Sequence, residues 1–128
     1  MPDPKMILLI DDESSICKFT KLNLERSGAY RVTVAYSGEE GLKLAEQSEF
    51  DLVITDFRMP GMDGKTVLDA LKIMRPHCPV VLFSIYHDDS DELTRAIVAK
   101  ADGLISKPID REQMTRVIEA ALATNRKG

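Results

Sequence analysis

Residues 51–64 read D-L-V-I-T-D-F-R-M-P-G-M-D-G and place an acid at the end of an apolar run. Leu52, Val53 and Ile54 form the run, Asp56 closes it, and the residues that follow are typical of a turn. A buried strand that carries a carboxylate at its C-terminal tip, followed at once by a loop, is where an open α/β sheet places its chemistry. A lone aspartate in this position also serves simply to cap a turn, so the other strand ends have to distinguish the two interpretations.

Four further segments are rich in apolar or β-branched residues and are bounded by charged or turn residues, a pattern typical of strands. Together with 51–56, the expected strands cover residues 6–10, 30–36, 79–85 and 103–106. Amphipathic segments between them predict helices that begin near residues 14, 38, 65, 88 and 110. Five strands that alternate with five helices predict an α/β fold in which a parallel sheet is covered by helices on both faces.

The first helix is expected to begin at Ser14 or Ser15, either of which can cap it. Ile16, Phe19 and Leu24 are expected to form part of its apolar face. In the second helix, a serine at the start and a glutamate three residues later form a capping box, here Ser37 and Glu40. The strand at 30–36 mixes polar and apolar residues, which indicates an edge position.

The composition is that of one soluble domain. The chain has 128 residues, of which 44% are hydrophobic and 30% charged, and this length is enough to bury a core without disulfides. A net charge of −4 without a basic cluster argues against direct nucleic-acid binding. Cys17 and Cys78 stand alone and are expected to be reduced thiols. Since no signal peptide or membrane span is present in these residues, a cytoplasmic location is expected.

Parallel strands bring their C-terminal ends to one edge of the sheet. Four strand ends carry polar residues, which are Asp11 with Asp12, Asp56, Ser84 and Lys107. Crowded carboxylates at such an edge favour a hard divalent cation, and Mg²⁺ fits because it needs only one or two carboxylates beside water and phosphoryl oxygens. A dinucleotide site is not supported, because acids occupy the place of the phosphate-binding glycines after the first strand.

The ordered set of motifs D-D, D-x-x-M-P-x-x-D-G, a serine, and K-P resembles the receiver domain of bacterial two-component response regulators. The resemblance spans the chain from about Met6 to about Ala123, which leaves 124–128 as a tail or the start of a linker to a single domain 1–128. It implies a flavodoxin-like, doubly wound (βα)5 fold with strand order 2-1-3-4-5. It also implies a phosphoprotein of the cytoplasm that works in phosphorelay signal transduction.

The resemblance further implies the roles of the site residues. Asp56 would accept a phosphoryl group from the phosphohistidine of a sensor histidine kinase or a phosphotransfer protein, which forms a 4-aspartylphosphate. Asp12 would bind Mg²⁺ directly and Asp11 largely through water, beside Asp56 and the backbone carbonyl of Arg58.

Lys107 would pair with the phosphoryl oxygens, and Ser84 would donate a hydrogen bond to one of them. Such a protein is a switch that is phosphorylated and dephosphorylated, rather than a turnover enzyme. The surface made by helix 4, strand 5 and helix 5 would be the usual place for a homodimer or a target. No membrane contact is expected.

The chain departs from the family pattern near the expected site. Leu104 stands where an aromatic residue is common, which bears on how the switch is transmitted, and Ile85 stands where a small residue is common. Arg58 and Tyr86 flank the expected mouth of the site. We therefore hypothesise that these bulky side chains shield an aspartyl-phosphate from water.

Two other functions fit parts of the pattern. A degenerate receiver would bind proteins without being phosphorylated, and Leu104 and Ile85 are compatible with it. A Mg²⁺-dependent phosphatase would use Asp56 as its nucleophile, but Arg58 stands where such an enzyme needs a second acid.

Overall fold

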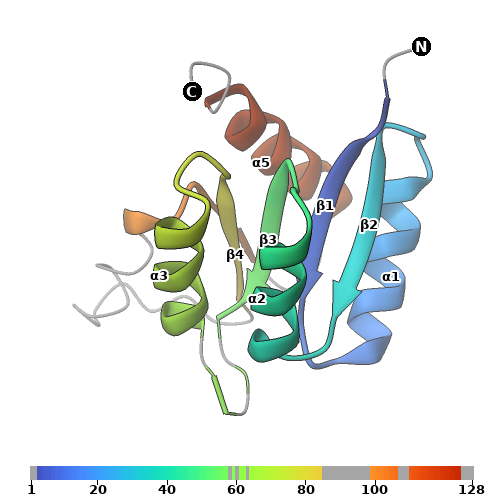
Figure 1. The fold of residues 1–128 in the computed structure, drawn as a ribbon. Coiled ribbons are helices and arrows are strands. Elements are labelled where there is room, and N and C mark those ends of the chain that lie inside the picture. The colour runs from blue at the N-terminus through green and yellow to red at the C-terminus, as the bar shows by residue number, and fades with distance from the viewer. Residues whose placement is uncertain are drawn as a thin grey trace.

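The computed structural model describes residues 3–57, 59, 61–62, 64–84, 99–106 and 110–124. Its five strands form one sheet in the order β2-β1-β3-β4-β5, and every neighbouring pair is parallel. The predicted order is therefore confirmed, including the edge position of β2 (Figure 1). The strands are β1 (Lys5–Ile10), β2 (Tyr30–Ala35), β3 (Leu52–Asp56), β4 (Val80–Ser84) and β5 (Gly103–Ser106).

Helices cover both faces of the sheet (Figure 1). Those described are α1 (Ser14–Glu25), α2 (Gly38–Gln47), α3 (Gly64–Met74) and α5 (Arg111–Thr124). The apolar residues of α1 and α5 share one buried cluster with one face of the sheet, and those of α2 and α3 share a second cluster with the other face. The predicted fourth helix lies outside the described residues, apart from residues 99–100, which are helical. In the part of the chain described, no helix has both the length and the apolar character needed to cross a membrane.

The central strands supply both clusters through their alternation. In β1, Ile7 and Leu9 pack on the α1–α5 side, whereas Leu8 and Ile10 pack on the α2–α3 side, and all four are fully buried. Successive side chains of a strand point to opposite faces, so an uninterrupted apolar run suits a strand that is covered on both sides. The apolar run of β1 thus matches its interior position in the sheet, between β2 and β3.

The structure corrects two predictions for α1. Glu13, rather than Ser14 or Ser15, is the N-cap residue, and its side chain makes no capping hydrogen bond. Phe19 is 52% exposed, whereas Thr20 is fully buried. The buried face consists of Cys17, Thr20 and Leu24, which follow one another by three and four residues along a single helical face.

The capping box of α2 forms, but its glutamate binds the backbone one residue before the N-cap serine. The side chain of Ser37 accepts a hydrogen bond from the backbone N–H of Glu40 at 3.1 Å, as predicted. The carboxylate of Glu40 accepts from the backbone N–H of Tyr36 at 2.6 Å, one residue before the serine. The two hydrogen bonds thus satisfy backbone N–H groups on both sides of the turn between β2 and α2.

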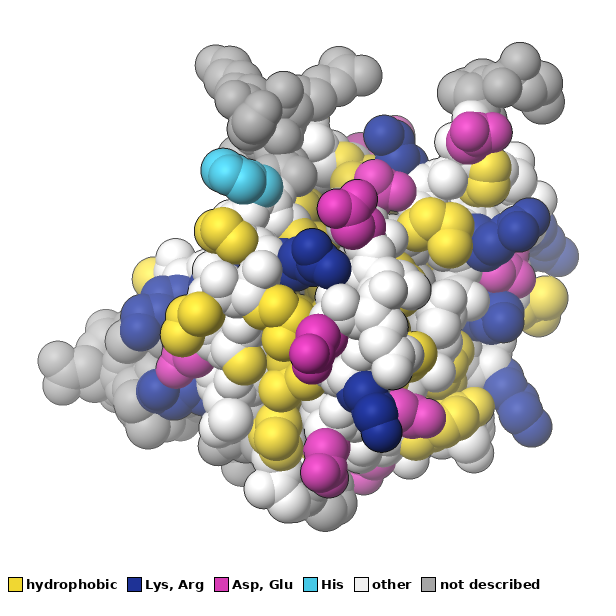
Figure 2. All heavy atoms as spheres, viewed as in Figure 1, with side chains coloured by type: hydrophobic (Ala, Val, Ile, Leu, Met, Phe, Trp, Pro, Cys, Tyr) yellow, Lys and Arg dark blue, Asp and Glu magenta, His cyan; other side chains and the backbone are white. Residues whose placement is uncertain are grey.

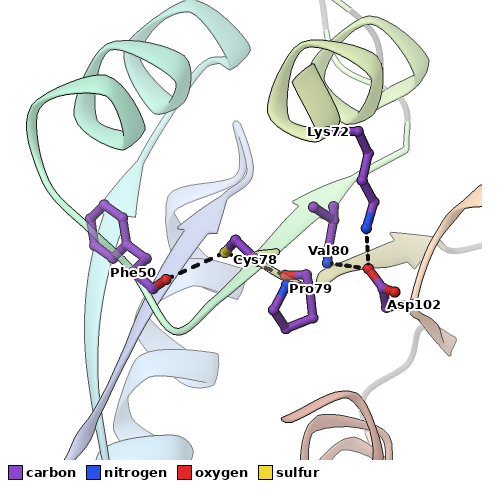
Figure 3. A network of polar contacts seen from close by, with 6 residues as sticks. All are labelled: Phe50, Lys72, Cys78, Pro79, Val80 and Asp102. Carbon is purple, nitrogen blue, oxygen red and sulfur yellow. Dashed lines mark hydrogen bonds and ion pairs between the residues drawn. The ribbon is translucent and has the colours of Figure 1, made fainter. Parts of the chain in front are cut away.

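Asp102 joins α3 to the beginnings of β4 and β5 (Figure 3). Its Oδ2 accepts from the backbone N–H of Val80 at 2.8 Å and from Nζ of Lys72 at 2.5 Å, and its own N–H donates to the carbonyl of Val80 at 2.8 Å.

Nearby, the Cys78 thiol donates to the carbonyl of Phe50 at 3.4 Å. Burial raises the pKa of Cys78 to about 11. Neither Cys78 nor the buried Cys17 forms a disulfide, as predicted.

We expect Asp102→Ala to lower the free energy of unfolding by about 1–3 kcal/mol, because it leaves the partly buried N–H of Val80 without its acceptor. Lys72→Met removes only a half-exposed ion pair and should cost less than about 1 kcal/mol. Urea denaturation of both variants measures the difference. Equal losses would show that the ion pair, and not the backbone hydrogen bond, carries the effect.

Candidate functional site

Two neighbouring strands of the sheet bring three carboxylates together. Asp11 and Asp12 follow the last residue of β1, and Asp56 is the last residue of β3. Since Ile10 pairs with Thr55 in the parallel register, the two strand ends lie level with each other. Asp11, Asp12 and Asp56 each offer a carboxylate oxygen, and these oxygens all lie within 4.8 Å of one another. The convergence predicted from the strand ends is confirmed for these three residues.

The three acids differ in their exposure to solvent. Asp11 is fully buried and Asp56 is 7% exposed, whereas Asp12 is exposed. The cluster therefore has a buried base and one open side, so that a bound group can keep contact with water. Oxygen donors that are close together and partly exposed to solvent suit Mg²⁺, which keeps several waters and takes few protein carboxylates. The three side chains thus fit a divalent cation of this class.

Asp11 is held in place by the beginning of α1 and by the edge strand. Its Oδ1 accepts from the backbone N–H of Glu13 at 3.0 Å, and its own N–H donates to the carbonyl of Ala35 at 3.0 Å. The Cys17 thiol donates to the Asp11 carbonyl at 3.3 Å. An aspartate that bonds to the backbone two residues on forms an Asx-turn. Asp11 therefore orders the turn into α1 as well as facing the cluster.

The backbone around Asp56 is fixed from both sides, by groups that the sequence analysis did not single out. The hydroxyl of Thr55 donates to the Asp56 carbonyl at 3.2 Å. Beyond Asp56, the N–H of Phe57 donates to the Phe83 carbonyl at 3.0 Å, and the N–H of Gly64 donates to the Phe57 carbonyl at 2.8 Å. The loop after β3 thus starts after Phe57, and Gly64, the first residue of α3 beyond it, is hydrogen-bonded back to Phe57. In the sequence, the turn-forming residues after Asp56 indicated a loop but not its closure on Phe57.

Gly64 has no room for a side chain. A Cβ at this position would lie 2.7 Å from Phe57 Cα and 2.8 Å from the carbonyl oxygen of Asp56, both backbone atoms. We expect Gly64→Ala to lower the free energy of unfolding by about 1–3 kcal/mol, as overpacking does, although alanine ordinarily favours a helix over glycine by about 1 kcal/mol. Thermal unfolding measures this effect. Ile73→Ala, at an 84% exposed position of the same helix, is the control and should change stability by less than about 0.5 kcal/mol. A stabilised Gly64→Ala variant would contradict the prediction.

The remaining predicted site residues are only partly described. Ser84 is the last residue of β4 and pairs with Ser106 of β5, so its backbone lies at the same edge of the sheet as Asp56. Arg58 and Lys107 lie outside the described residues, as do Ile85 and Tyr86, which were expected near the mouth of the site. Leu104 is half-buried in β5 and packs against the α2–α3 cluster.

Comparison with known proteins places the chain in a family. The pattern of the response regulator receiver domain matches residues 7–119. Among curated proteins, the chain is 34% identical to transcriptional regulatory protein GlrR of Escherichia coli, over 93% of this chain and 26% of that protein. It is also 34% identical to transcriptional regulatory protein PhoP of Bacillus subtilis, over 92% of this chain and 48% of that protein.

Solved structures give the same result. A CheY-like response regulator receiver domain protein from Methanospirillum hungatei JF-1 superposes with a TM-score of 0.86 at 30% identity, covering 97% of this chain and 98% of that one. A receiver domain protein from Clostridium thermocellum gives 0.84 at 32% identity, covering 96% and 98%. With its flavodoxin-like sheet and its cluster of strand-end acids, the chain belongs to the response regulator receiver domains of two-component systems, a family of signalling switches.

Proposed function

We propose that Asp56 is a phosphoacceptor and that the chain switches its output surface when this residue is phosphorylated. The observation that carries the proposal is the set of three carboxylates, from the ends of two neighbouring strands, whose oxygens lie within 4.8 Å of one another. Asp56 is a suitable nucleophile because its backbone is held on both sides while its side chain, 7% exposed, faces the cluster. Carboxylates are known to form aspartyl-phosphates.

The transfer is a displacement at phosphorus. An Asp56 carboxylate oxygen forms a bond to the phosphorus atom as the bond between phosphorus and the imidazole nitrogen of a phosphohistidine breaks. The electron pair of the broken bond stays on the imidazole, which takes up a proton. Such a transfer depends mainly on positioning and on the neutralisation of charge. The rigid ends of β1 and β3 supply the positioning.

Asp11, Asp12, Asp56 and the backbone carbonyl of Arg58 are the groups that we propose hold Mg²⁺. A bound divalent cation supplies positive charge that offsets the carboxylates and the incoming phosphoryl oxygens. Asp11 and Asp56 are preorganised for this role by buried backbone contacts. Asp12, being exposed, presents its carboxylate from the open side of the cluster.

Ser84 and Lys107 are proposed to contact the phosphoryl group. The position of Ser84 at the end of β4, next to β3 in the sheet, supports a hydrogen bond from its hydroxyl. Lys107 directly follows β5 in the sequence and would supply a point charge to the phosphoryl oxygens. The proposed place for a homodimer or a target includes β5 and α5, and its third part, the predicted fourth helix, lies almost entirely outside the described residues.

Receiver domains of response regulators interact with histidine kinases, and a sensor histidine kinase or a phosphotransfer protein is the proposed phosphodonor of this chain, in the cytoplasm. The chain spans about a quarter to a half of the length of the curated relatives that it matches. Those relatives are named as transcriptional regulatory proteins. The proposal for residues 1–128 is therefore limited to a single receiver domain that does not itself contact nucleic acid.

The proposal is tested by incubating the chain with acetyl phosphate, in one sample with Mg²⁺ and in another with EDTA. Mass spectrometry of the intact chain then measures how much phosphoryl group has been added. We expect a gain of one phosphoryl group that requires Mg²⁺ and decays after the donor is removed. No gain from acetyl phosphate or from a phosphorylated kinase would contradict the proposal and favour a binding module that works without phosphate. Continuous release of phosphate from small phosphoesters would contradict the proposed switch and indicate a phosphatase.

A further inference from the structure

Strand β2 forms one edge of the sheet, so every second residue of it turns its backbone groups away from β1. The carbonyl of Ala35 accepts from the N–H of Asp11, which continues β1, and this places the odd-numbered residues on the β1 side. The even-numbered residues therefore face outward, and the N–H groups concerned are those of Val32, Val34 and Tyr36. An edge of this kind is a template on which another strand can pair.

The first of these outward N–H groups is bound by a glutamate from α1. Oε2 of Glu25, the last residue of the helix, accepts from the N–H of Val32 at 2.9 Å. An acid at the C-terminal end of a helix lies at the negative end of the helix dipole, so α1 itself gains nothing from it. Val32 is 2% exposed, and its N–H needs an acceptor within the protein. The contact with β2 is thus the stabilising role of Glu25.

The last outward N–H group is bound by a glutamate from α2. The carboxylate of Glu40 accepts from the N–H of Tyr36 at 2.6 Å. In an ordinary capping box the glutamate binds the N–H of the N-cap residue itself, which here is Ser37. Binding one residue earlier puts the carboxylate on the sheet edge instead. Since α1 and α2 pack on opposite faces of the sheet (Figure 1), each face contributes one glutamate to the same edge.

The N–H of Val34 lies midway between the two occupied groups. No acceptor for it is present among the described residues. A second copy of β2 that paired antiparallel about Val34 would match Val34 with Val34 and Val32 with Tyr36 around a two-fold axis. Both outer pairs need the N–H groups that the glutamates occupy. The single open donor at the centre does not suffice for a ladder of hydrogen bonds.

Charge on the same side of the molecule adds to this effect. Arg31 of β2 is exposed, and Lys and Arg side chains are prominent on the side where β2 and α1 lie (Figure 2). Two copies that met around a two-fold axis would bring like charges together. Charged side chains on an edge strand are a common means of preventing edge-to-edge pairing.

We propose that Glu25 and Glu40 are autoinhibitory contacts that keep the edge of β2 from pairing with a second copy of the chain. Each carboxylate occupies a backbone donor that the pairing would need, at either end of the stretch that would pair. Neither glutamate belongs to the cluster of three aspartates. The proposal is therefore independent of the phosphorylation of Asp56.

The double variant Glu25→Ala/Glu40→Ala frees both N–H groups. We expect its self-association constant, measured by sedimentation equilibrium, to exceed that of the unaltered chain about tenfold or more, because two further donors in each copy gain acceptors. The matched control is Glu39→Ala/Glu46→Ala, which removes two exposed acids of α2 that form no hydrogen bond with β2 in the described part of the chain. The control should associate like the unaltered chain. Far-UV circular dichroism checks that both variants are folded.

Val34→Pro, added to the double variant, locates the contact. Proline removes the outward N–H at the centre of the pairing and leaves the hydrogen bonds between β1 and β2 in place, so association should return to the level of the unaltered chain. Amide hydrogen exchange in the unaltered chain needs no variant, and it decides the matter if the double variant does not fold. We expect exchange at Val32 and Tyr36 to be at least about tenfold slower than at Val34.

Four outcomes would each overturn the proposal. They are unchanged association of the folded double variant, an equal rise in the control, association that persists after Val34→Pro, and equal exchange at the three amides.

Discussion

Asp56→Asn is expected to abolish phosphorylation by acetyl phosphate and by a phosphorylated kinase. An amide has nearly the shape of the carboxylate but lacks the nucleophilic oxygen, and loss of a nucleophile typically costs roughly 10³-fold or more in rate. The fold should be retained, because backbone groups and the Thr55 hydroxyl fix this part of β3. Incorporation measured by intact mass, with circular dichroism as a check on folding, tests this prediction.

Asp51→Asn is the matched control. Asp51 precedes the same strand at its other end, where its carboxylate accepts from the N–H of Met6 at 2.7 Å. An asparagine keeps an acceptor oxygen there, so phosphorylation should proceed at nearly the rate of the unaltered chain. Undiminished incorporation into Asp56→Asn would place the acceptor on another residue.

Mg²⁺ is expected to stabilise the folded chain, because the three carboxylates converge only in the native state. A ligand that binds only the folded state adds about 1.4 kcal/mol at ten times its Kd and about 2.7 kcal/mol at a hundred times. Asp12→Asn should weaken Mg²⁺ binding by at least roughly tenfold. Even the loss of a residue that only hydrogen-bonds to a metal ligand typically lowers metal affinity by about that factor. Most of the stabilisation at moderate Mg²⁺ should then disappear.

Thermal unfolding over a Mg²⁺ titration measures this effect, with NaCl of the same ionic strength to correct for screening. Glu13→Gln is the matched control, because it removes a neighbouring exposed charge that does not belong to the cluster. If the two variants respond alike to Mg²⁺, the stabilisation is a general effect of ionic strength and not binding at the three aspartates.

The sheet and the acidic cluster were predictable from the sequence because both follow from the pattern along single strands. An uninterrupted apolar run requires cover on both faces, as β1 shows, and parallel strands must end at one edge. Asp11, Asp12 and Asp56 could therefore be placed together without knowing any contact. The motif order added the strand order, which the residues alone left open.

The local details could not be predicted because they depend on tertiary contacts. Large apolar side chains suggested that Phe19 is buried, but the packing of α1 buries Thr20 instead and leaves Phe19 exposed. The N-cap at Glu13 depends on the turn after β1, where the Asp11 carboxylate accepts from the Glu13 N–H and the Glu13 carbonyl accepts from the Cys17 N–H. The close approach of Gly64 to the Asp56 carbonyl depends on how the loop closes, which spacing does not show.

The location of the phosphoryl group tests the central claim most directly. The chain is phosphorylated with acetyl phosphate and Mg²⁺, treated with borohydride to reduce the acyl phosphate to an alcohol, digested, and mapped by mass spectrometry. We expect reduction at residue 56 alone, in an amount that follows the Mg²⁺-dependent gain in intact mass. Reduction at Asp11, Asp12 or any other acid, or a phosphorylated chain with residue 56 unchanged, would contradict it.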